Sequence, residues 1–445
     1  MNFNKLVEIV KNSGIEGAGG AGFPSYAKLD KKIDTIILNC AECEPLFKMH
    51  RQLLAGHAYE IISALHMICE TVGAKQFIIA VKEKHKKTVD AVEAVLTDYE
   101  NGKLFLLPSV YPAGDEVVLI YETTKRRVPP GNIPISVGVC VYNVETVWNI
   151  YHAVKHGSNV TTKYVTVAGE VKNPTTFCVP IGMQFSELIE LAGGVTCSNY
   201  DVIKGGPMTV TLASEYDVVT KNTNGILVFP ETHPVIMKRK VKTAISISRA
   251  KSTCCQCRMC TDLCPRNLIG MPIEPNTFMD AVANGAVGNT KAIANTMYCV
   301  SCGLCELYSC SQGLNPRSLI EEFKARMRAE GVKPEVYNEP YNHVKKAREY
   351  RKVPMQRLKE RLDLVKYDVP ADITNLEIMP NRVKLLMSQC IGAPSVPCVD
   401  VGDKVTKGQV IANAAKGLSL PVHASIDGKV IEVNNKFIII DRREE

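Results

Sequence analysis

Residues 14–28 read GIEGAGGAGFPSYAK and residues 35–45 read TIILNCAECEP, and these two stretches decide the fold expected for the first third of the chain. Glycine at the density of the first stretch lets the backbone approach a ligand closely and present its N–H groups to a phosphate. In the second stretch a short apolar strand, 35–39, ends in polar side chains. Ligands bind at the carboxyl ends of the strands in open α/β sheets, and the polar side chains lie at such an end. Both stretches therefore predict a binding site.

The glycine-rich stretch follows a helix, expected at about Lys5–Val10, whereas a dinucleotide-binding fingerprint follows a strand. The context therefore excludes a plain dinucleotide fold, and a flexible linker remains the alternative for this stretch taken alone. Beyond it, a helix at about 57–72, a strand at 76–81 and a helix at about 85–99 continue an α/β alternation. We expect residues 1–155 to form one α/β domain.

Nine of the 17 cysteines lie between Cys254 and Cys310, in two closely spaced blocks. The first block reads Cys-x2-Cys-x2-Cys-x3-Cys-Pro, the run with which bacterial ferredoxins hold iron–sulfur clusters, and its fourth cysteine ligates a second cluster. The second block, Cys-x2-Cys-x2-Cys-x4-Cys, supplies partners for that fourth cysteine. By ferredoxin logic, residues 246–335 form an α-helical domain with two [4Fe-4S] clusters, and the ligand sets are Cys254, Cys257, Cys260 and Cys310 for one and Cys264, Cys299, Cys302 and Cys305 for the other.

The second block departs from ferredoxin spacing by one residue and has Ser311 where proline is usual, so one residue is expected to bulge before Cys310. Cys255 is a spare thiol in the first loop and is not expected to be a ligand. Structural zinc is the alternative, since C-x2-C pairs also build zinc sites. Tetrahedral zinc sites combine one such pair with a distant second pair, so two triplets favour iron–sulfur clusters.

Four motifs in order resemble the flavin-binding half shared by the flavoprotein subunit of respiratory complex I and the RnfC component of the Rnf complex. They are GAGGAGFPSYAK, NCAECEP, YPAGDE at 111–116 and YNVETVWNI at 142–150. The resemblance implies an FMN site formed by Gly17, Gly19, Gly20, Gly22, Lys28, Asn39, Glu42, Gly114, Glu116 and Asn143. Ala18 stands where complex I has arginine, and Leu29-Asp30 replaces an aromatic stretch that stacks on nicotinamide there. Cys40 and Cys43, inside the flavin motif, are interpreted as incidental thiols rather than a metal pair.

Three further segments complete the expected domain organisation. Residues 156–245 resemble a small β-grasp (SLBB) domain with a return segment, and they are interpreted as a spacer and packing module. Residues 336–376 are a basic linker, for which a solvated helix interrupted by Pro354 is favoured over a surface for membranes, acidic partners or nucleic acid. Residues 377–445 resemble a lipoyl-type, all-β barrel-sandwich hybrid. Its hairpin at 421–425 holds no lysine, which argues against a swinging arm.

The order of these modules resembles the cobalamin reductases of propanediol-utilisation microcompartments, because the barrel-sandwich module comes last, whereas it opens the RnfC component. The resemblance implies an oxidoreductase that passes electrons from NAD(P)H through FMN and two [4Fe-4S] clusters to cobalamin or to an acceptor protein, such as an adenosyltransferase, with a shell protein as a further partner. Hydride transfer needs no acid–base residue, so no catalytic residue is nominated. The alternatives are an Rnf-type NADH:ferredoxin electron-transport protein and a non-enzymatic iron–sulfur conduit or adaptor in a microcompartment.

Composition agrees with a protein of several globular domains: 445 residues, 46% hydrophobic and 22% charged. No apolar stretch approaches the ~18 residues of a membrane span, which leaves only peripheral association with a membrane open. An odd number of cysteines and no export signal predict a reducing, cytoplasmic location, inside a bacterial microcompartment by the resemblance. Of the net charge of +7, residues 343–368 within the linker carry +5, and no nucleic-acid partner is expected.

Overall fold

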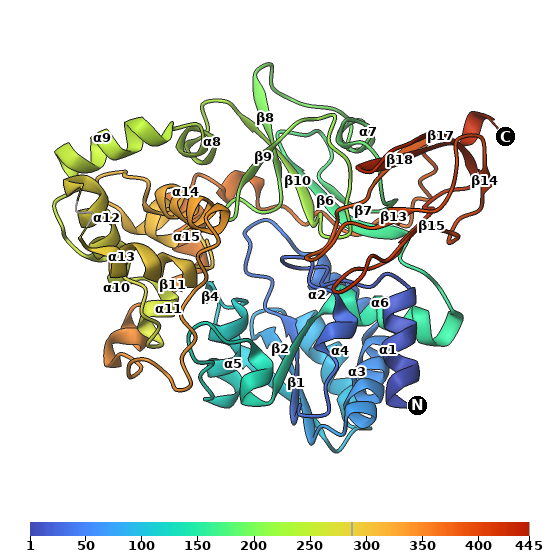
Figure 1. The fold of residues 1–445 in the computed structure, drawn as a ribbon, viewed down its shortest axis with the longest axis horizontal. Helices are drawn as coiled ribbons and strands as arrows, with labels where there is room; N and C mark the ends of the chain where they lie inside the picture. The colour runs from blue at the N-terminus through green and yellow to red at the C-terminus, as the bar shows by residue number, and fades with distance from the viewer. Residues whose placement is uncertain (286–287, 445) are drawn as a thin grey trace.

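The computed structural model describes residues 1–285 and 288–444, and it arranges them in four packed modules (Figure 1). The α/β module is drawn in blue and cyan, the β-grasp module in green, the cysteine-rich helical module in yellow, and the last β-rich module in red. Among the described residues, no helix has the length and apolarity needed to cross a bilayer.

The α/β module is built on a parallel four-stranded sheet in the order β3-β2-β1-β5. Along β1, Ile36 and Leu38 face one core and Ile37 faces another, as the alternation of side chains along a strand requires. Five helices cover the first face and α5 covers the second. The elements are α1 (Phe3–Asn12), β1 (Thr35–Cys40), α2 (Met49–Gly56), α3 (Ala58–Val72), β2 (Gln76–Lys82), α4 (Lys86–Leu96), β3 (Gly102–Leu107), β4 (Val110–Tyr111), α5 (Glu116–Thr124), β5 (Val139–Asn143) and α6 (Val144–His156).

The β-grasp module is a five-stranded sheet in the order β7-β6-β10-β8-β9, with α7 packed on one face. Phe185 and Leu188 of α7 are fully buried against that face, which explains why this short helix forms. The elements are β6 (Thr162–Gly169), β7 (Thr175–Pro180), α7 (Phe185–Leu191), β8 (Tyr200–Lys204), β9 (Thr211–Ala213) and β10 (Gly225–Pro230).

The helical module that holds the nine clustered cysteines has a small apolar core around Phe278 and Leu319. Between Cys305 and Ser309 the chain forms a π-helical turn, η4. A π-turn takes up one more residue than an α-turn, so the bulge expected before Cys310 is confirmed. The helices are α8 (Pro234–Arg239), α9 (Thr243–Thr253), α10 (Met259–Asp262), α11 (Pro265–Leu268), α12 (Pro275–Asn284), α13 (Thr290–Ala294) and α14 (Pro316–Ala329).

The interpretation of residues 343–368 as a solvated helix is wrong. The segment forms only short elements, namely η5 (Lys346–Tyr350), β11 (Val353–Pro354), α15 (Met355–Arg361) and η6 (Val365–Tyr367), and β11 pairs with β4 of the α/β module. Leu358 is fully buried, and Arg348 Nη2 lies 2.5 Å from Glu122 Oε1. The segment packs against the rest of the protein because its apolar residues are buried in a core and its basic residues pair with carboxylates. Pro354 prevents one continuous helix.

The last module consists of two small antiparallel sheets, β12-β18-β17-β14 and β13-β15-β16. It shares one core with the α/β module and contacts the glycine-rich loop, where the Ile391 N–H donates to the Gly22 carbonyl at 2.9 Å. Its strands are β12 (Arg382–Leu386), β13 (Val396–Pro397), β14 (Lys404–Val405), β15 (Val410–Asn413), β16 (Val422–His423), β17 (Gly428–Val433) and β18 (Phe437–Asp441). The other single-turn helices of the chain are η1 (Ser25–Lys28), η2 (Pro134–Val137), η3 (Asn295–Tyr298) and η7 (Arg442–Glu444).

Candidate functional site

The glycine-rich loop lies against the carboxyl end of β5. The Gly17 N–H donates to the Phe23 carbonyl at 2.9 Å, and the Ala18 N–H donates to Thr146 Oγ1 at 3.0 Å, in the first turn of α6. A Cβ atom at Gly19 would lie 2.3 Å from Asn143 Nδ2. The loop backbone therefore approaches the capping residue of α6 so closely that a larger residue at position 19 would force the Asn143 side chain to move.

The carboxyl end of β1 is joined to the turn that precedes α5. Asn39 donates from Nδ2 to the Gly114 carbonyl at 3.0 Å and accepts at Oδ1 from the Ala41 N–H at 3.1 Å. A Cβ atom at Gly114 would lie 3.2 Å from Cys43 Sγ and 3.3 Å from Ala41 Cβ. The two predicted flavin motifs, 39–45 and 111–116, are thus held together at one edge of the sheet.

Lys28 and Glu116 face each other at the same edge. Lys28 Nζ lies 3.5 Å from Glu116 Oε1 and donates to the Val141 carbonyl of β5 at 2.9 Å. Glu116 is the first residue of α5, where a carboxylate is favoured by the helix dipole. A cation and an anion therefore flank the end of β5, beside the glycine-rich loop.

Glu42 has a left-handed backbone, with φ 41°, and its side chain points toward α2. Its Oε1 accepts from the His50 N–H at 2.8 Å, and its Oε2 lies 3.7 Å from Arg51 Nε. Lys82 Nζ donates to the Glu42 carbonyl at 3.2 Å, and burial lowers the pKa of Lys82 to about 8. Glu42 is thus fixed at the sheet edge by α2 and β2.

The remaining two predicted glycines have different surroundings. Gly20 would have open space around a Cβ atom. Gly22 has a φ of 68°, and a Cβ atom there would lie 2.9 Å from Glu16 Oε1. The structure joins predicted flavin residues in three pairs, Gly19 with Asn143, Asn39 with Gly114, and Lys28 with Glu116. The role of all ten residues in binding FMN stays a prediction.

Glu16 is a site residue that the sequence did not predict. Its carboxylate is 4% exposed, and neither oxygen has a hydrogen-bond partner. Burial raises the pKa of Glu16 to about 7, against the opposing effect of Lys221 and Lys163. Lys221, itself buried, donates from Nζ to the Gly14 carbonyl at 2.8 Å. The one feature of the sequence that could have pointed to Glu16 is its position, as an acidic residue, beside a run of glycine and alanine.

These donors fit a flavin mononucleotide. Closely approached glycine N–H groups, Lys28 and the amino end of the 13-residue helix α6 are what a phosphate-bearing, planar cofactor requires. The buried carboxylate oxygens of Glu16, beside the loop, have no hydrogen-bond partner. The residues present therefore agree with the flavin implied by the motifs.

The clustered cysteines line two separate small cavities. Each cavity contains one of the two expected ligand sets: Cys254, Cys257, Cys260 and Cys310 line the first cavity, and Cys264, Cys299, Cys302 and Cys305 line the second. Cys255 also lines the first cavity. Within residues 1–285 and 288–444, no three His, Cys, Asp or Glu side chains are placed to hold a single metal ion. Four thiols around a cavity suit a multi-iron cluster.

The thiols of these cavities are close enough to influence one another. Burial, followed by Cys310, Cys254 and Cys257, raises the pKa of Cys260 to about 12. Burial also raises the pKa of Cys264 to about 11. Burial raises the pKa of Cys305 well above its usual value, and Cys260 of the other cavity contributes to this shift. Buried thiolates this close repel each other unless cations compensate them, which iron would do. The donor set and its burial therefore fit two adjacent clusters.

The second cavity is tied to the flavin motifs by two contacts. Tyr111 donates from its hydroxyl to the Cys302 carbonyl at 2.6 Å. Arg266, which lines the cavity, pairs through Nη2 with Asp115 Oδ2 at 3.0 Å. Asp115 stands between Gly114 and Glu116, so this cavity adjoins the candidate flavin site. The first cavity is bordered by an exposed loop that carries Cys255 and Cys257.

Comparison with protein families assigns each module. Residues 10–152 match the Nuo51 FMN-binding domain, 164–212 the SLBB domain, 253–315 the 4Fe-4S dicluster domain, and 369–443 the RnfC barrel sandwich hybrid domain. The predicted fold class and the predicted FMN and [4Fe-4S] cofactors are confirmed by these matches.

Comparison with individual proteins extends the similarity over the whole chain. The cobalamin reductase PduS of Citrobacter freundii is 40% identical over 437 residues, which is 98% of this chain and 96% of the relative. PduS of Salmonella typhimurium strain LT2 is 39% identical over 444 residues, 99% of this chain and 97% of the relative. Component C of the Na(+)-translocating ferredoxin:NAD(+) oxidoreductase complex of Acetobacterium woodii is 32% identical over 274 residues, 60% of this chain and 59% of the relative.

Among solved structures, an NAD+-reducing [NiFe]-hydrogenase in the H2-reduced state has a similar fold. The TM-score is 0.51 at 19% identity, and the match covers 75% of this chain and 64% of that chain. At this identity the likeness concerns the fold alone.

Proposed function

The chain belongs to the family of the cobalamin reductases PduS, and on that premise we propose that it reduces cobalamin with electrons from NADH. Its flavin and iron–sulfur domains make it an electron-transfer oxidoreductase. The observation that carries the proposal is the direct bonding of the second cysteine cavity to the flavin motifs, through Asp115–Arg266 and Tyr111–Cys302.

We assign FMN to the edge of the α/β module. Its ligands are the ten residues predicted from the motifs, from Gly17 in the glycine-rich loop to Asn143 at the start of α6. A flavin accepts a hydride as an electron pair and releases electrons singly, which one-electron carriers require. The protein supplies backbone N–H donors, places the Lys28–Glu116 pair beside β5, and fixes the loop by contacts to α6.

We assign one [4Fe-4S] cluster to each cysteine cavity, with the ligand sets given by the spacing. The set that contains Cys264 lies beside the flavin motifs, and the set that contains Cys257 lies beside exposed chain. This arrangement supports a path from the flavin motifs to the surface of the helical module.

The acceptor and the location follow from the relatives rather than from the geometry. Cobalamin is proposed because the full-length relatives are cobalamin reductases. An adenosyltransferase or a shell protein as partner and a cytoplasmic, microcompartment location rest on the same kinship. An Rnf-type role is the second candidate, favoured by the match to the Acetobacterium component and opposed by the position of the barrel-sandwich module at the end of the chain.

An anaerobic reduction experiment tests the proposal. Protein loaded with FMN and iron is mixed with NADH, and the flavin absorbance is followed before and after addition of cob(III)alamin. We expect NADH to bleach the flavin and cobalamin to restore its absorbance. Absence of bleaching would refute the oxidoreductase and support a conduit. Bleaching followed by reduction of ferredoxin but not of cobalamin would support the Rnf-type role.

A further inference from the structure

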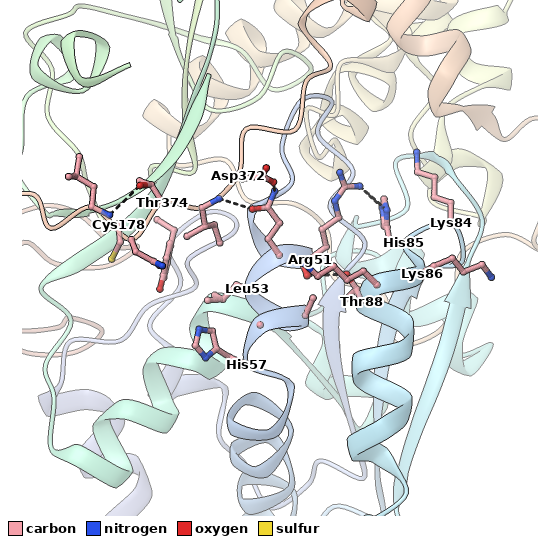
Figure 2. A pocket seen from close by; sticks show the side chains of 18 residues that line it. Arg51, Leu53, His57, Lys84, His85, Lys86, Thr88, Cys178, Asp372 and Thr374 are labelled. Atoms are coloured by element: carbon pink, nitrogen blue, oxygen red, sulfur yellow. Dashed lines mark hydrogen bonds between the residues drawn. The ribbon is translucent and has the colours of Figure 1, made fainter. Parts of the chain in front are cut away.

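A large cavity of the described chain lies away from both cysteine cavities, between the α/β and β-grasp modules. It measures about 900 Å³. Figure 2 shows its walls: Lys84, His85 and Lys86 lie on one side, and Cys178 and Thr374 lie across from them. Its size is that of a site for a small organic ligand.

One wall of this cavity is strongly basic. Arg51, Lys84, Lys86 and Lys87 line it, and among the described lining residues only Asp372 carries a carboxylate. The nearby acid Asp368 already pairs with Lys48 at 3.0 Å and with Lys359. The pKa of Lys84 is lowered mainly by burial and, to a smaller extent, by the nearby cations Lys359 and Arg51. The wall is therefore suited to an anion.

Arg51 is held in place on this wall by a neutral histidine. Its Nη1 lies 2.7 Å from His85 Nδ1. Burial, then Arg51, Lys82 and Lys84, lower the pKa of His85 to about 3, so the imidazole accepts from the guanidinium. Arg51 Nε faces Glu42 on the other side at 3.7 Å. A guanidinium fixed in this way loses little freedom on binding an anion.

The first turn of α4 belongs to the same wall. Residues 85–88 line the cavity, and His85, at the cap position, makes no side-chain hydrogen bond to the helix N–H groups. The Thr88 N–H already donates to the His85 carbonyl at 3.0 Å, so the N–H groups of Lys86 and Lys87, at the start of this 11-residue helix, are the ones that add to the attraction for an anion. The opposite wall carries Tyr164, Ile373 and Leu376, which present aromatic and apolar surface.

We propose that this cavity binds a phosphate-bearing organic ligand, with the phosphate on Arg51, Lys84 and the first turn of α4 and the organic body against the opposite wall. Several cations and helix N–H groups together match the multiple acceptor oxygens of a phosphate. The phosphate could belong to a free nucleotide or to the nucleotide tail of a corrinoid. The site stands on the cavity itself and does not depend on the proposed function.

Calorimetric titration of the FMN-loaded full chain tests the proposal. ADP is compared with adenosine, and cobalamin with cobinamide, which lacks the nucleotide tail. Phosphate-dependent binding that Lys84→Gln and Lys87→Gln each weaken by roughly tenfold supports the site. Lys103→Gln, the same charge change at an exposed position of β3 outside the cavity, is the matched control and leaves the affinity unchanged.

The outcomes distinguish a free nucleotide from a corrinoid as the source of the phosphate, and a separate measurement tests the proposed function. Preference for ADP over adenosine identifies a free nucleotide, and preference for cobalamin over cobinamide identifies a corrinoid. The proposal is overturned if neither phosphate-bearing probe binds better than its counterpart, or if Lys84→Gln and Lys103→Gln have equal effects. Bleaching of the flavin by NADH, measured on the same variants, tests the proposed function separately.

Discussion

Arg266 donates from both Nε and Nη2 to Asp115 Oδ2, at 3.1 and 3.0 Å, and this pair connects the second cysteine cavity to the start of α5. Asp115 also caps α5 by accepting from the Val117 and Val118 N–H groups. One buried carboxylate thus links the helix that carries Glu116 to the residue that follows Cys264-Pro265.

Arg266→Met is expected to destabilise the protein strongly, because it leaves Asp115 buried without its cation. Removing one partner of such a pair costs about 3–5 kcal/mol. Arg326→Met, which breaks the exposed pair with Glu322, is the control and should change stability by less than about 1 kcal/mol. Urea unfolding of the cofactor-loaded proteins measures both. Equal losses of stability in the two variants would show that the Arg266–Asp115 pair stabilises the fold no more than an exposed ion pair does.

Gly19→Ala is expected to weaken FMN binding by roughly tenfold or more, since overpacking costs about 1–3 kcal/mol. The new methyl group would displace Asn143, which it would approach to 2.3 Å. Gly56→Ala, at a position with open space, should leave the affinity unchanged. Fluorescence titration of flavin-free protein with FMN gives both affinities. Unchanged affinity in Gly19→Ala would place the flavin elsewhere.

Cys305→Ala is expected to remove about one cluster's share of the iron and to leave the flavin content intact. Cys305 lines the second cavity only, and the flavin motifs belong to another module. Cys255→Ala is the control, because its thiol is exposed and lies outside the expected ligand sets. Iron, sulfide and flavin analysis of anaerobically purified protein measures the outcome. Loss of iron and flavin together would instead indicate unfolding.

Glu16 should make stability depend on pH. Burial raises its pKa in the folded state to about 7, above its unfolded value, so the folded state holds the proton more tightly. Its contribution to stability is therefore full below the unfolded pKa, near 4.5, and is lost as the pH rises toward 7. Across this range Glu16→Gln should lose less stability than the wild type. Glu8→Gln, at an exposed position, should follow the wild type, and parallel curves for all three proteins would contradict the prediction.

Local patterns predicted the elements that depend on neighbouring residues. The cysteine spacing anticipated the bulge that η4 provides, and apolar periodicity anticipated β1 and α3. Helix α2 escaped notice because its mixed sequence, MHRQLLAG, carries little periodic signal. Side-chain and strand pairings over long sequence distances could not be foreseen: β11 joins β4, and Lys221 reaches Gly14. The basic cavity could not be predicted for the same reason, since five separate segments of the chain build it.

The contact between the last module and the glycine-rich loop sets an order of assembly during synthesis. Gly14 and Gly22 leave the ribosome among the first residues, whereas Pro421, whose carbonyl accepts from Lys221 Nζ at 3.3 Å, and Ile391 leave among the last. Domains fold as they emerge from the ribosome. The contacts of the glycine-rich loop are therefore complete only after the last module has been synthesised. A chain that ended before residue 391 would thus lack the contacts that the last module makes with the glycine-rich loop.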